Sequence, residues 1–384
     1  MRQSVRCGNS VICKNKYIAT LVQPAPVLRV REVDVRPRPE YFPALTGLRF
    51  LLAIWVMLHH LVSKGMMLEA WSHTLPMMAR VFLEQGHVAV RTFFVLSGFV
   101  LARGYANSRW TRRDIASYGI ARLARVYPVY VVSLLLITGF VGEFLMRADV
   151  SSRAKFDAIA AYGLVLQGWM PNAGAGWNTP AWSLSCEFLF YLCLPLILIW
   201  LGERSRWRLA ALLVTSLLVP VLLRRTMSLK PILHLGDFLV GIAVAQIYRR
   251  RWKGAGAWLY IPAIVATMAT VLLPVSELGM LLRPLNGLLV LGFALGGGVI
   301  DRILSTGTAQ FLGQASYSMY ILHVPLLWWF GNRGPEPLRG LGAGIAIIYF
   351  AGVILVSAAC FQWIEKPANR FIRAWASSRA GRSG

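Results

Sequence analysis

Long apolar runs follow one another along most of the chain, each separated from the next by a short polar or basic stretch. A helix of roughly 17–25 apolar residues is long enough to cross the hydrocarbon core of a bilayer. The pattern therefore predicts an all-α fold, a polytopic transmembrane helical bundle. The predicted spans are 43–62, 86–103, 124–145, 181–201, 208–223, 231–248, 257–274, 281–300, 310–330 and 341–363.

The segment 156–170 decides the predicted topology. It is apolar but short, so it is either a further span or a re-entrant or surface-lying helix. If it does not cross and the N-terminus is inside, 27 Lys and Arg lie on the inner side and 12 on the outer side; if it crosses, the split is 20 to 19. Only the first arrangement shows the usual cytoplasmic excess of Lys and Arg. We therefore predict about ten spans with both termini cytoplasmic.

Composition supports a membrane protein with a flexible arm. The chain is 57% hydrophobic and 15% charged, whereas roughly a quarter of the residues of a soluble domain are charged. Residues 1–40 are basic, contain prolines and lack the apolar core of a signal peptide, so we predict a flexible cytoplasmic arm. Residues 41–370 are predicted to be the transmembrane domain, and residues 371–384 a basic cytoplasmic tail.

The net charge of +24 is explained by membrane orientation and by attraction to anionic lipids. No basic-aromatic module typical of nucleic-acid binding occurs, so we expect membrane lipids as partners and no nucleic acid. The five cysteines contain no C-x-x-C pair, which argues against a zinc site or a disulfide framework. We expect no metal.

Ionisable residues interrupt the first span, "LTGLRFLLAIWVMLHHLV". Each such group costs roughly 2.5–3.5 kcal/mol at the centre of a span, so it is a functional candidate by default. Arg49 and His60 are eleven residues apart, which places them on one helix face about 16 Å apart along the axis. His59 points about 100° away from that face. The alternative is that the three side chains reach back to the membrane interfaces.

Three other apolar segments carry polar groups. In "NTPAWSLSCEFLFYLCLP", Glu187 lies in the first turns of an apolar helix, where a carboxylate needs a cation or a proton; structural pairing alone is the alternative. Arg122 and Arg125 lie three residues apart on one face and form a fork suited to phosphate; orientation in the membrane is the alternative. His323, near Tyr320, is either functional or a structural histidine of the bundle.

Taken in order, these phrases resemble the acyltransferase 3 family of integral-membrane acyltransferases over residues 41–370. The family's opening arginine and histidine fall on Arg49 and His60 in "ALTGLRFLLAIWVMLHH". The other matching phrases are "FFVLSGF" with Ser97, the pair Arg122 and Arg125 before Tyr127 and Pro128, Trp182–Pro195, Leu312–Pro325 and "IEKP" at Ile364–Pro367. Four positions depart from the family pattern: Thr46, Arg91, Phe188 and Val324.

The resemblance implies an enzyme of the cell inner membrane that transfers an acyl group, commonly acetyl, from cytoplasmic acyl-CoA. The acceptor would be a hydroxyl of an exopolysaccharide, a lipopolysaccharide O-antigen or a lipid-linked glycan. Polysaccharide-assembly proteins are possible partners, and acyl-CoA is a co-substrate, with no permanently bound cofactor expected. The sequence lacks the G-x-S-x-G motif of serine hydrolases, the H-E-x-x-H motif of zinc proteases and the phosphate-binding loop of nucleotide hydrolases.

The resemblance also assigns roles to residues. His60 would be the general base, or less simply the carrier of a covalent acyl group, with Glu187 orienting it. Donor-binding residues would be Arg49, Arg122 and Arg125. Residues on the supporting or acceptor side would be Ser97, Trp182, Ser183, Tyr317 and His323. Two other functions stay open: a transporter or flippase for a lipid-linked sugar, and a sensor or scaffold in which the polar groups only hold helices together.

Overall fold

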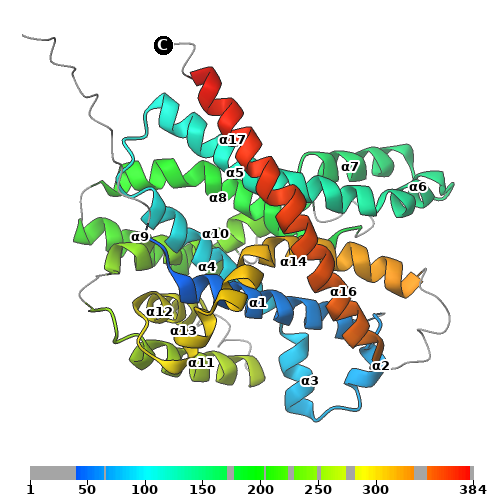
Figure 1. The fold of residues 1–384 in the computed structure, drawn as a ribbon, viewed down its shortest axis with the longest axis horizontal. Helices are drawn as coiled ribbons and strands as arrows, with labels where there is room; N and C mark the ends of the chain where they lie inside the picture. The colour runs from blue at the N-terminus through cyan, green and yellow to red at the C-terminus, as the bar shows by residue number, and fades with distance from the viewer. Residues whose placement is uncertain are drawn as a thin grey trace, which may run out of the picture. The chain divides into compact units, whose positions relative to one another are not determined.

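The computed structural model describes residues 40–64, 66–170, 177–202, 205–223, 229–248, 252–273, 282–332 and 344–380. Within these ranges the chain forms helices and no strands, which confirms the all-α prediction. Each predicted span contains one long helix (Figure 1). These helices are α1 (Pro43–Val62), α4 (His87–Gly104), α5 (Arg112–Leu136), α8 (Trp182–Leu201), α9 (Arg206–Leu223), α10 (Lys230–Ile247), α11 (Ala257–Leu272), α12 (Leu282–Leu295), α14 (Gly307–Asn332) and α16 (Gly344–Cys360).

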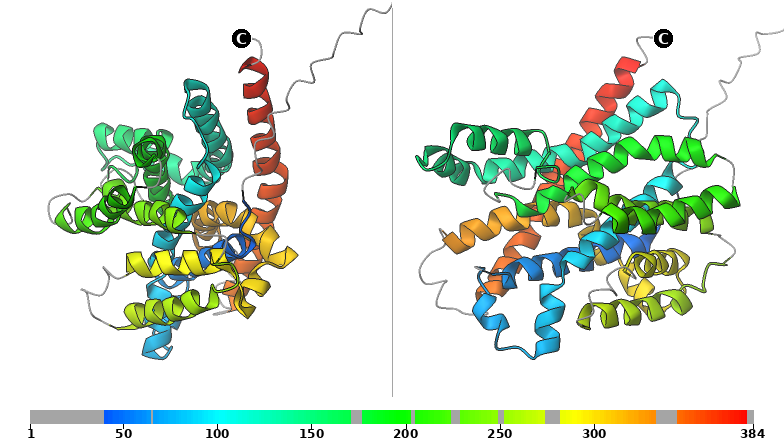
Figure 2. Two further views of the ribbon diagram at one scale, coloured as in Figure 1. Left: turned by 90° about the vertical axis from the view of Figure 1, so that its left-hand side faces the viewer. Right: turned by 180° about the vertical axis from the view of Figure 1, so that it is seen from behind.

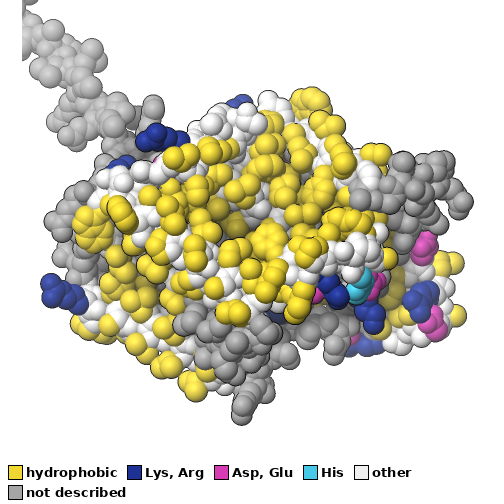
Figure 3. Space-filling model, turned by 90° about the horizontal axis from the view of Figure 1, so that it is seen from below, with side chains coloured by type: hydrophobic (Ala, Val, Ile, Leu, Met, Phe, Trp, Pro, Cys, Tyr) yellow, Lys and Arg dark blue, Asp and Glu magenta, His cyan; other side chains and the backbone are white. Residues whose placement is uncertain are grey.

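The other helical segments lie between these elements or after the last of them. They are α2 (Glu69–Ser72), α3 (Met77–Glu84), α6 (Thr138–Met146), α7 (Ser152–Gly163), the 3-10 turn η1 (Thr179–Ala181), α13 (Val299–Leu304), the π-helical segment η4 (Phe361–Glu365) and α17 (Lys366–Ala380). Seven helical stretches in the described part of the chain are long and apolar enough to cross a membrane, and α11 and α12 are shorter apolar helices. Figure 3 shows one face covered largely by apolar side chains, with charged groups toward its margin. Ten spans and cytoplasmic termini stay predictions.

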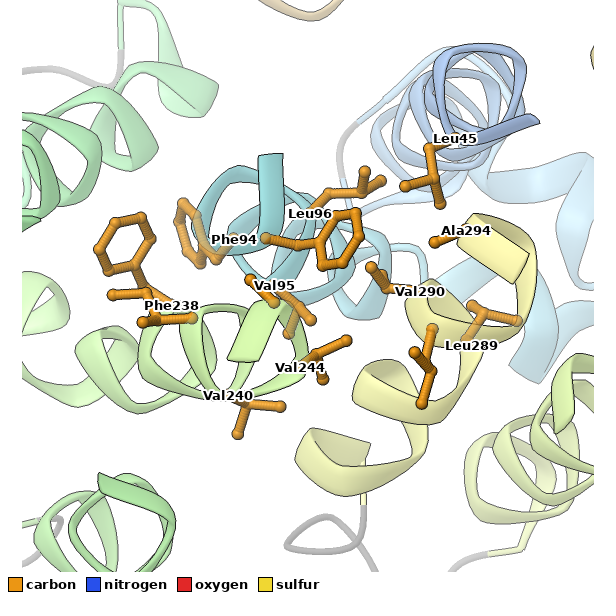
Figure 4. Packing of buried hydrophobic residues seen from close by; sticks show 14 of the residues in the cluster. Leu45, Phe94, Val95, Leu96, Phe238, Val240, Val244, Leu289, Val290 and Ala294 are labelled. Carbon is orange, nitrogen blue, oxygen red and sulfur yellow. The ribbon is translucent and has the colours of Figure 1, made fainter. Parts of the chain in front are cut away.

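Small residues bring the central helices α4 and α10 together. A Cβ on Gly98 would lie 2.2 Å from the carbonyl oxygen of Phe238, and one on Gly241 would lie 2.0 Å from that of Val95. Glycine is therefore required at both positions, as is common where membrane helices pack closely. Apolar side chains of α1 and α12 pack with those of α4 and α10 in one core (Figure 4).

The helices α1 and α14 run side by side in the same direction. A Cβ on Gly313 would lie 1.9 Å from the carbonyl oxygen of Thr46, which lets the start of α14 approach the start of α1. Further along, His60 of α1 meets His323 of α14. The pair of parallel helices therefore carries side chains from both helices to the same levels of the bundle.

Three predicted spans have wrong boundaries. The span predicted at 281–300 is interrupted, because α12 ends at Leu295 and the positive φ angles of Gly296 and Gly297 separate it from α13. The span predicted at 124–145 begins earlier, because Thr111 and Asp114 form a capping box that starts α5 at Arg112. It also breaks after Leu136, where the indole N–H of Trp329 donates to the Leu136 carbonyl at 2.7 Å. At the other end of the chain, the span predicted at 341–363 continues through η4 into α17, which packs beside α5 (Figure 2).

Other predicted segments are placed as follows. Residues 156–170 hold the last part of α7, a helix of 12 residues, which at about 1.5 Å per residue is too short to cross a bilayer. Of the predicted cytoplasmic tail, residues 371–380 are helical. The predicted arm, residues 1–40, lies outside the described residues except for Glu40, whose carboxylate accepts a hydrogen bond from Arg103 at 2.9 Å.

Candidate active site

Two histidines from neighbouring helices form a contact in the interior of the bundle. The Nδ1 atom of His60 lies 3.3 Å from Nε2 of His323, and the ring centroids are 4.9 Å apart. His323 is fully buried, whereas His60 keeps part of its surface exposed. The first span and the fourth polar segment of the sequence thus meet at this pair.

Backbone carbonyls determine which nitrogen of each ring carries hydrogen. The Nδ1 atom of His60 lies 2.9 Å from the carbonyl oxygen of Val56, and Nδ1 of His323 lies 2.7 Å from that of Tyr320. A carbonyl oxygen only accepts, so each Nδ1 is the donor and, in the neutral ring, each Nε2 has a lone pair. The Nδ1–H of His60 therefore points to Val56 and His323, and its Nε2 is the basic nitrogen.

The arginines predicted to bind the donor gather with two carboxylates in what we call the arginine cluster: Arg49, Arg122, Arg125, Glu187 and Glu365. Arg125 of α5 forms an ion pair with Glu365 of η4. Glu365 is almost completely buried, and its second oxygen accepts a hydrogen bond from the Ser318 hydroxyl of α14 at 2.7 Å. A π-helical segment thus directs a buried carboxylate at one of the arginines.

Glu187 lies in the arginine cluster. Its carboxylate accepts a hydrogen bond from Tyr191 at 2.6 Å and interacts electrostatically with all three arginines, Arg49 first among them. The ring nitrogen Nδ1 of His60 is contacted by Val56 and His323 instead. Among the described residues, His323 therefore occupies the orienting position that the sequence analysis assigned to Glu187.

Aromatic rings surround the third arginine of the cluster. The guanidinium of Arg122 lies 5.9 Å from the ring centroid of Tyr118 and 6.0 Å from that of Tyr105. Tyr105 in turn stacks on Trp110 with 5.6 Å between ring centroids. Arg49 and Arg122 are half-buried, so both keep some accessible surface. The cluster combines three permanent cations with partial exposure, which suits an anionic ligand.

The supporting residues lie at separate places. The buried Tyr317 donates to the carbonyl oxygen of Val126 at 2.7 Å and so ties α14 to α5 beside the arginine cluster. Ser183 donates to the carbonyl oxygen of Pro180 at 3.0 Å. Ser97 is half-buried in the middle of α4. Trp182, half-buried at the start of α8, contacts a second group of charges.

This second group, which we call the Asp237 cluster, consists of Arg91, His234, Asp237 and Arg283. The carboxylate of Asp237 is completely buried, and its Oδ1 atom lies 3.3 Å from the Nε atoms of both Arg91 and Arg283. Its Oδ2 atom lies 3.1 Å from Nδ1 of His234. The departure from the family pattern at Arg91 thus belongs to a buried ion-pair network that joins α4, α10 and α12.

The sequence analysis missed Glu365, Asp237 and Arg283. A signal for the first was present, because Glu365 is the acidic residue of the "IEKP" phrase at the end of an apolar run. Asp237 was equally visible as the only charged residue in "ILHLGDFLVGIAVA". Their ion-pair partners Arg125 and Arg91 are 240 and 146 residues away along the chain, so no local pattern links these charge pairs.

Chemically, the bundle provides a neutral imidazole with a defined basic nitrogen and, about three helical turns along α1, a group of arginines. Such an arrangement serves a transferase that takes a proton from a nucleophile while a negatively charged co-substrate is held nearby. The class defined by fold and site is thus a helical membrane protein with a histidine pair and a group of arginines inside the bundle.

Comparison with known proteins places the chain within this class. The family model described as "Acyltransferase domain" matches residues 42–362, and the chain belongs to the acyltransferase 3 family. It is an acyl-transferring enzyme, and its apolar helices and its family indicate a membrane protein.

Individual relatives are also named as acyltransferases. The chain is 28% identical to the acyltransferase MdmB of Streptomyces mycarofaciens, over 88% of this chain and 94% of that protein. It is 21% identical to the O-acetyltransferase OatA of Staphylococcus aureus (strain NCTC 8325 / PS 47), over 86% of this chain but only 58% of OatA. No solved structure matches the chain.

Proposed function

We propose that the protein is a multi-pass O-acyltransferase of the cell inner membrane that uses cytoplasmic acyl-CoA, most simply acetyl-CoA, as donor. The acceptor is a hydroxyl of an exopolysaccharide, an O-antigen or a lipid-linked glycan. The observation that carries the proposal is the His60–His323 pair, which leaves Nε2 of His60 as a basic nitrogen inside the bundle. The printed name of OatA, an O-acetyltransferase, supports an oxygen acceptor and an acetyl group.

In the proposed reaction, Nε2 of His60 takes the proton of the acceptor hydroxyl while the hydroxyl oxygen attacks the carbonyl carbon of the thioester. The carbon–sulfur bond then breaks, and the proton passes from His60 to the departing thiolate. The products are the ester and free CoA, and His60 returns to its neutral form. While His60 is charged, its Nδ1–H donates to Val56 and to the lone pair of His323, which stabilises the imidazolium.

The arginine cluster is the proposed donor site. Acyl-CoA carries several phosphate charges, and Arg122 and Arg125 lie on one face of α5. Glu365 and Glu187 position the guanidiniums without cancelling all of their charge, because three arginines face two carboxylates. The distance of about 16 Å between Arg49 and His60 along α1 is then spanned by the extended arm of the co-substrate that ends in the thioester.

Substitution of the base gives the first prediction. With the purified full-length protein, acetyl-CoA labelled in the acetyl group and a glycan extract from the host cell, label should move to the glycan. His60→Ala should reduce this transfer by about 10²–10⁴-fold, which is the usual contribution of a general base. Membrane abundance should stay unchanged, since His60 is only half-buried.

The matched control is His73→Ala, because His73 is an exposed histidine outside the site. Full activity of His60→Ala would remove His60 as the base. Movement of unlabelled sugar across a vesicle membrane, without transfer of label, would instead support the transporter alternative. Loss of abundance in His60→Ala together with loss of function would support the scaffold alternative.

A further inference from the structure

The Asp237 cluster has no role in the proton transfer or the donor site. Its members come from three helices, and α10 contributes Asp237 and His234. Lys230 lies on the same face of α10, because positions 230, 234 and 237 are spaced four and three residues apart. One face of α10 therefore places an ammonium, an imidazole and a carboxylate in a row from its first turn inward.

Positive charge exceeds negative charge here. Asp237 is shared by two guanidiniums, and the Nε atom of Arg283 lies within ion-pair distance of it but makes no hydrogen bond in the part of the chain that the structure describes. Arg283 also donates from Nη2 to the Leu233 carbonyl at 3.2 Å. The exposed Lys230 has its ammonium 4.7 Å from the Trp182 ring centroid, and no described carboxylate forms an ion pair with it.

An aromatic side chain connects this group to the histidine pair. The ring centroid of Trp182 lies 5.2 Å from that of His234. Trp182 follows η1, where the Tyr320 hydroxyl donates to the Pro180 carbonyl at 3.2 Å. Tyr320 in turn lies one turn before His323 on α14. The route from the cationic face of α10 to the proposed base thus has three non-covalent contacts, the last of them between His323 and His60.

We propose that Lys230, His234 and Arg283, arranged by Asp237 beside Trp182, form the acceptor subsite and recognise an oxyanion carried by the acceptor. This inference rests on the proposed function. A carboxylate or a phosphate on the acceptor accepts charge-assisted hydrogen bonds from Lys230 and Arg283, and the indole of Trp182 offers a flat apolar face to a sugar ring. The preferred acceptor is therefore an acidic glycan, either a uronic acid or a sugar phosphate.

The test uses the full chain in nanodiscs of phosphatidylcholine, with labelled acetyl-CoA and three acceptors of identical alkyl chain. The acceptors are octyl glucoside, octyl glucuronide and octyl glucoside 6-phosphate. We expect kcat/KM for at least one of the two anionic acceptors to exceed that for octyl glucoside by about tenfold or more, since one charge-assisted hydrogen bond is worth roughly that factor. The two anionic acceptors distinguish a carboxylate from a phosphate.

Two substitutions remove the proposed contacts. Lys230→Gln and Arg283→Gln should each lower the ratio of anionic to neutral kcat/KM by about tenfold, through KM. Lys230 is exposed, so Lys230→Gln keeps the test valid if Arg283→Gln does not fold. Arg80→Gln is the matched control, because Arg80 pairs with Glu84 on the surface of α3, and it should leave the ratio unchanged.

Each outcome is decisive. Equal kcat/KM for the three acceptors, or an anionic preference that survives in Lys230→Gln, would overturn the subsite. Release of CoA without label on any glycoside would also overturn it, while the enzyme class would stand. If the native protein neither releases CoA nor labels a glycoside or the host glycan extract, the proposed function itself fails.

Discussion

The two charge clusters inside the bundle differ in how many carboxylates hold their arginines. In the arginine cluster, Glu187 and Glu365 come from different helices, and each has a neutral hydrogen-bond partner as well. In the Asp237 cluster, a single carboxylate with no exposed surface holds two guanidiniums and an imidazole. Loss of one acid therefore weakens the first cluster but leaves the second without any described anion.

The largest expected effect is on the second cluster. Asp237→Ala removes the described ion-pair partner of Arg283 and leaves buried positive charge, which costs about 3–5 kcal/mol of folding free energy. Membrane abundance and the thermal midpoint of the detergent-purified protein should both fall sharply. The control is Asp157→Ala, because Asp157 pairs with the highly exposed Arg153 on the surface of α7. A thermal midpoint equal to that of the native protein would show that the Asp237 cluster is not a structural anchor.

The packing around the Asp237 cluster gives the next effect. Gly241→Ala places a Cβ about where the Val95 carbonyl oxygen already lies, since the expected distance is 2.0 Å. The helices α4 and α10 must separate, at a cost of about 1–3 kcal/mol for overpacking, measurable as a lower thermal midpoint. Gly119→Ala in α5 meets no atom within 4 Å and should not lower the midpoint. Similar midpoints for the two variants would contradict the close packing of α4 and α10.

A smaller effect is expected where the carboxylates are duplicated. Glu365→Gln keeps a hydrogen-bonding group beside Arg125 and Ser318 but removes the charge, so Arg125 loses its fixed position. We expect KM for acetyl-CoA to rise about tenfold, which is about 1.4 kcal/mol, with kcat changed less. Glu84→Gln removes an exposed pair with Arg80 and should leave KM unchanged. If Glu365→Gln alters kcat alone, Glu365 does not act through donor binding.

The smallest expected effect concerns a single hydrogen bond at the edge of the arginine cluster. Tyr317→Phe keeps the ring that lies beside Arg125 but removes the hydroxyl that binds the Val126 carbonyl. Loss of one neutral hydrogen bond costs about 1 kcal/mol, so chemical denaturation should show a shift of that size. An activity loss greater than tenfold at unchanged stability would assign Tyr317 a more direct role in the reaction.

Much of the fold was predictable because most helices are marked by the hydrophobicity of their own residues. Apolar length alone located α1, α4, α8 and α10 to within a few residues. The boundaries of α5 were wrong because a capping box outside the apolar run begins the helix, and because the break after Leu136 depends on Trp329, nearly 200 residues away. Local hydropathy contains no information about either cause.

For the site, the sequence named the residues but paired some of them differently. The eleven-residue spacing of Arg49 and His60 on one helix was readable, since it needs only helical geometry. The contact of His60 with His323 was not readable, because it depends on the packing of α1 against α14 through Gly313. Glu187 was assigned to His60 through the family resemblance, since its own sequence context asked only for a cation or a proton, and its electrostatic partners in the structure are the three arginines.

Because α1 and α14 run parallel, α14 contacts both the arginine cluster and the histidine pair, so neither can move without the other. On α14, Ser318 binds Glu365 and His323 meets His60, and only five residues separate the two positions. A shift of α14 by a single residue, about 1.5 Å, would break both contacts at once. Binding of a co-substrate to the arginine cluster would therefore change the position of the His60 imidazole relative to His323. The change would be a shift in the register of α1 and α14, and it would need no moving lid.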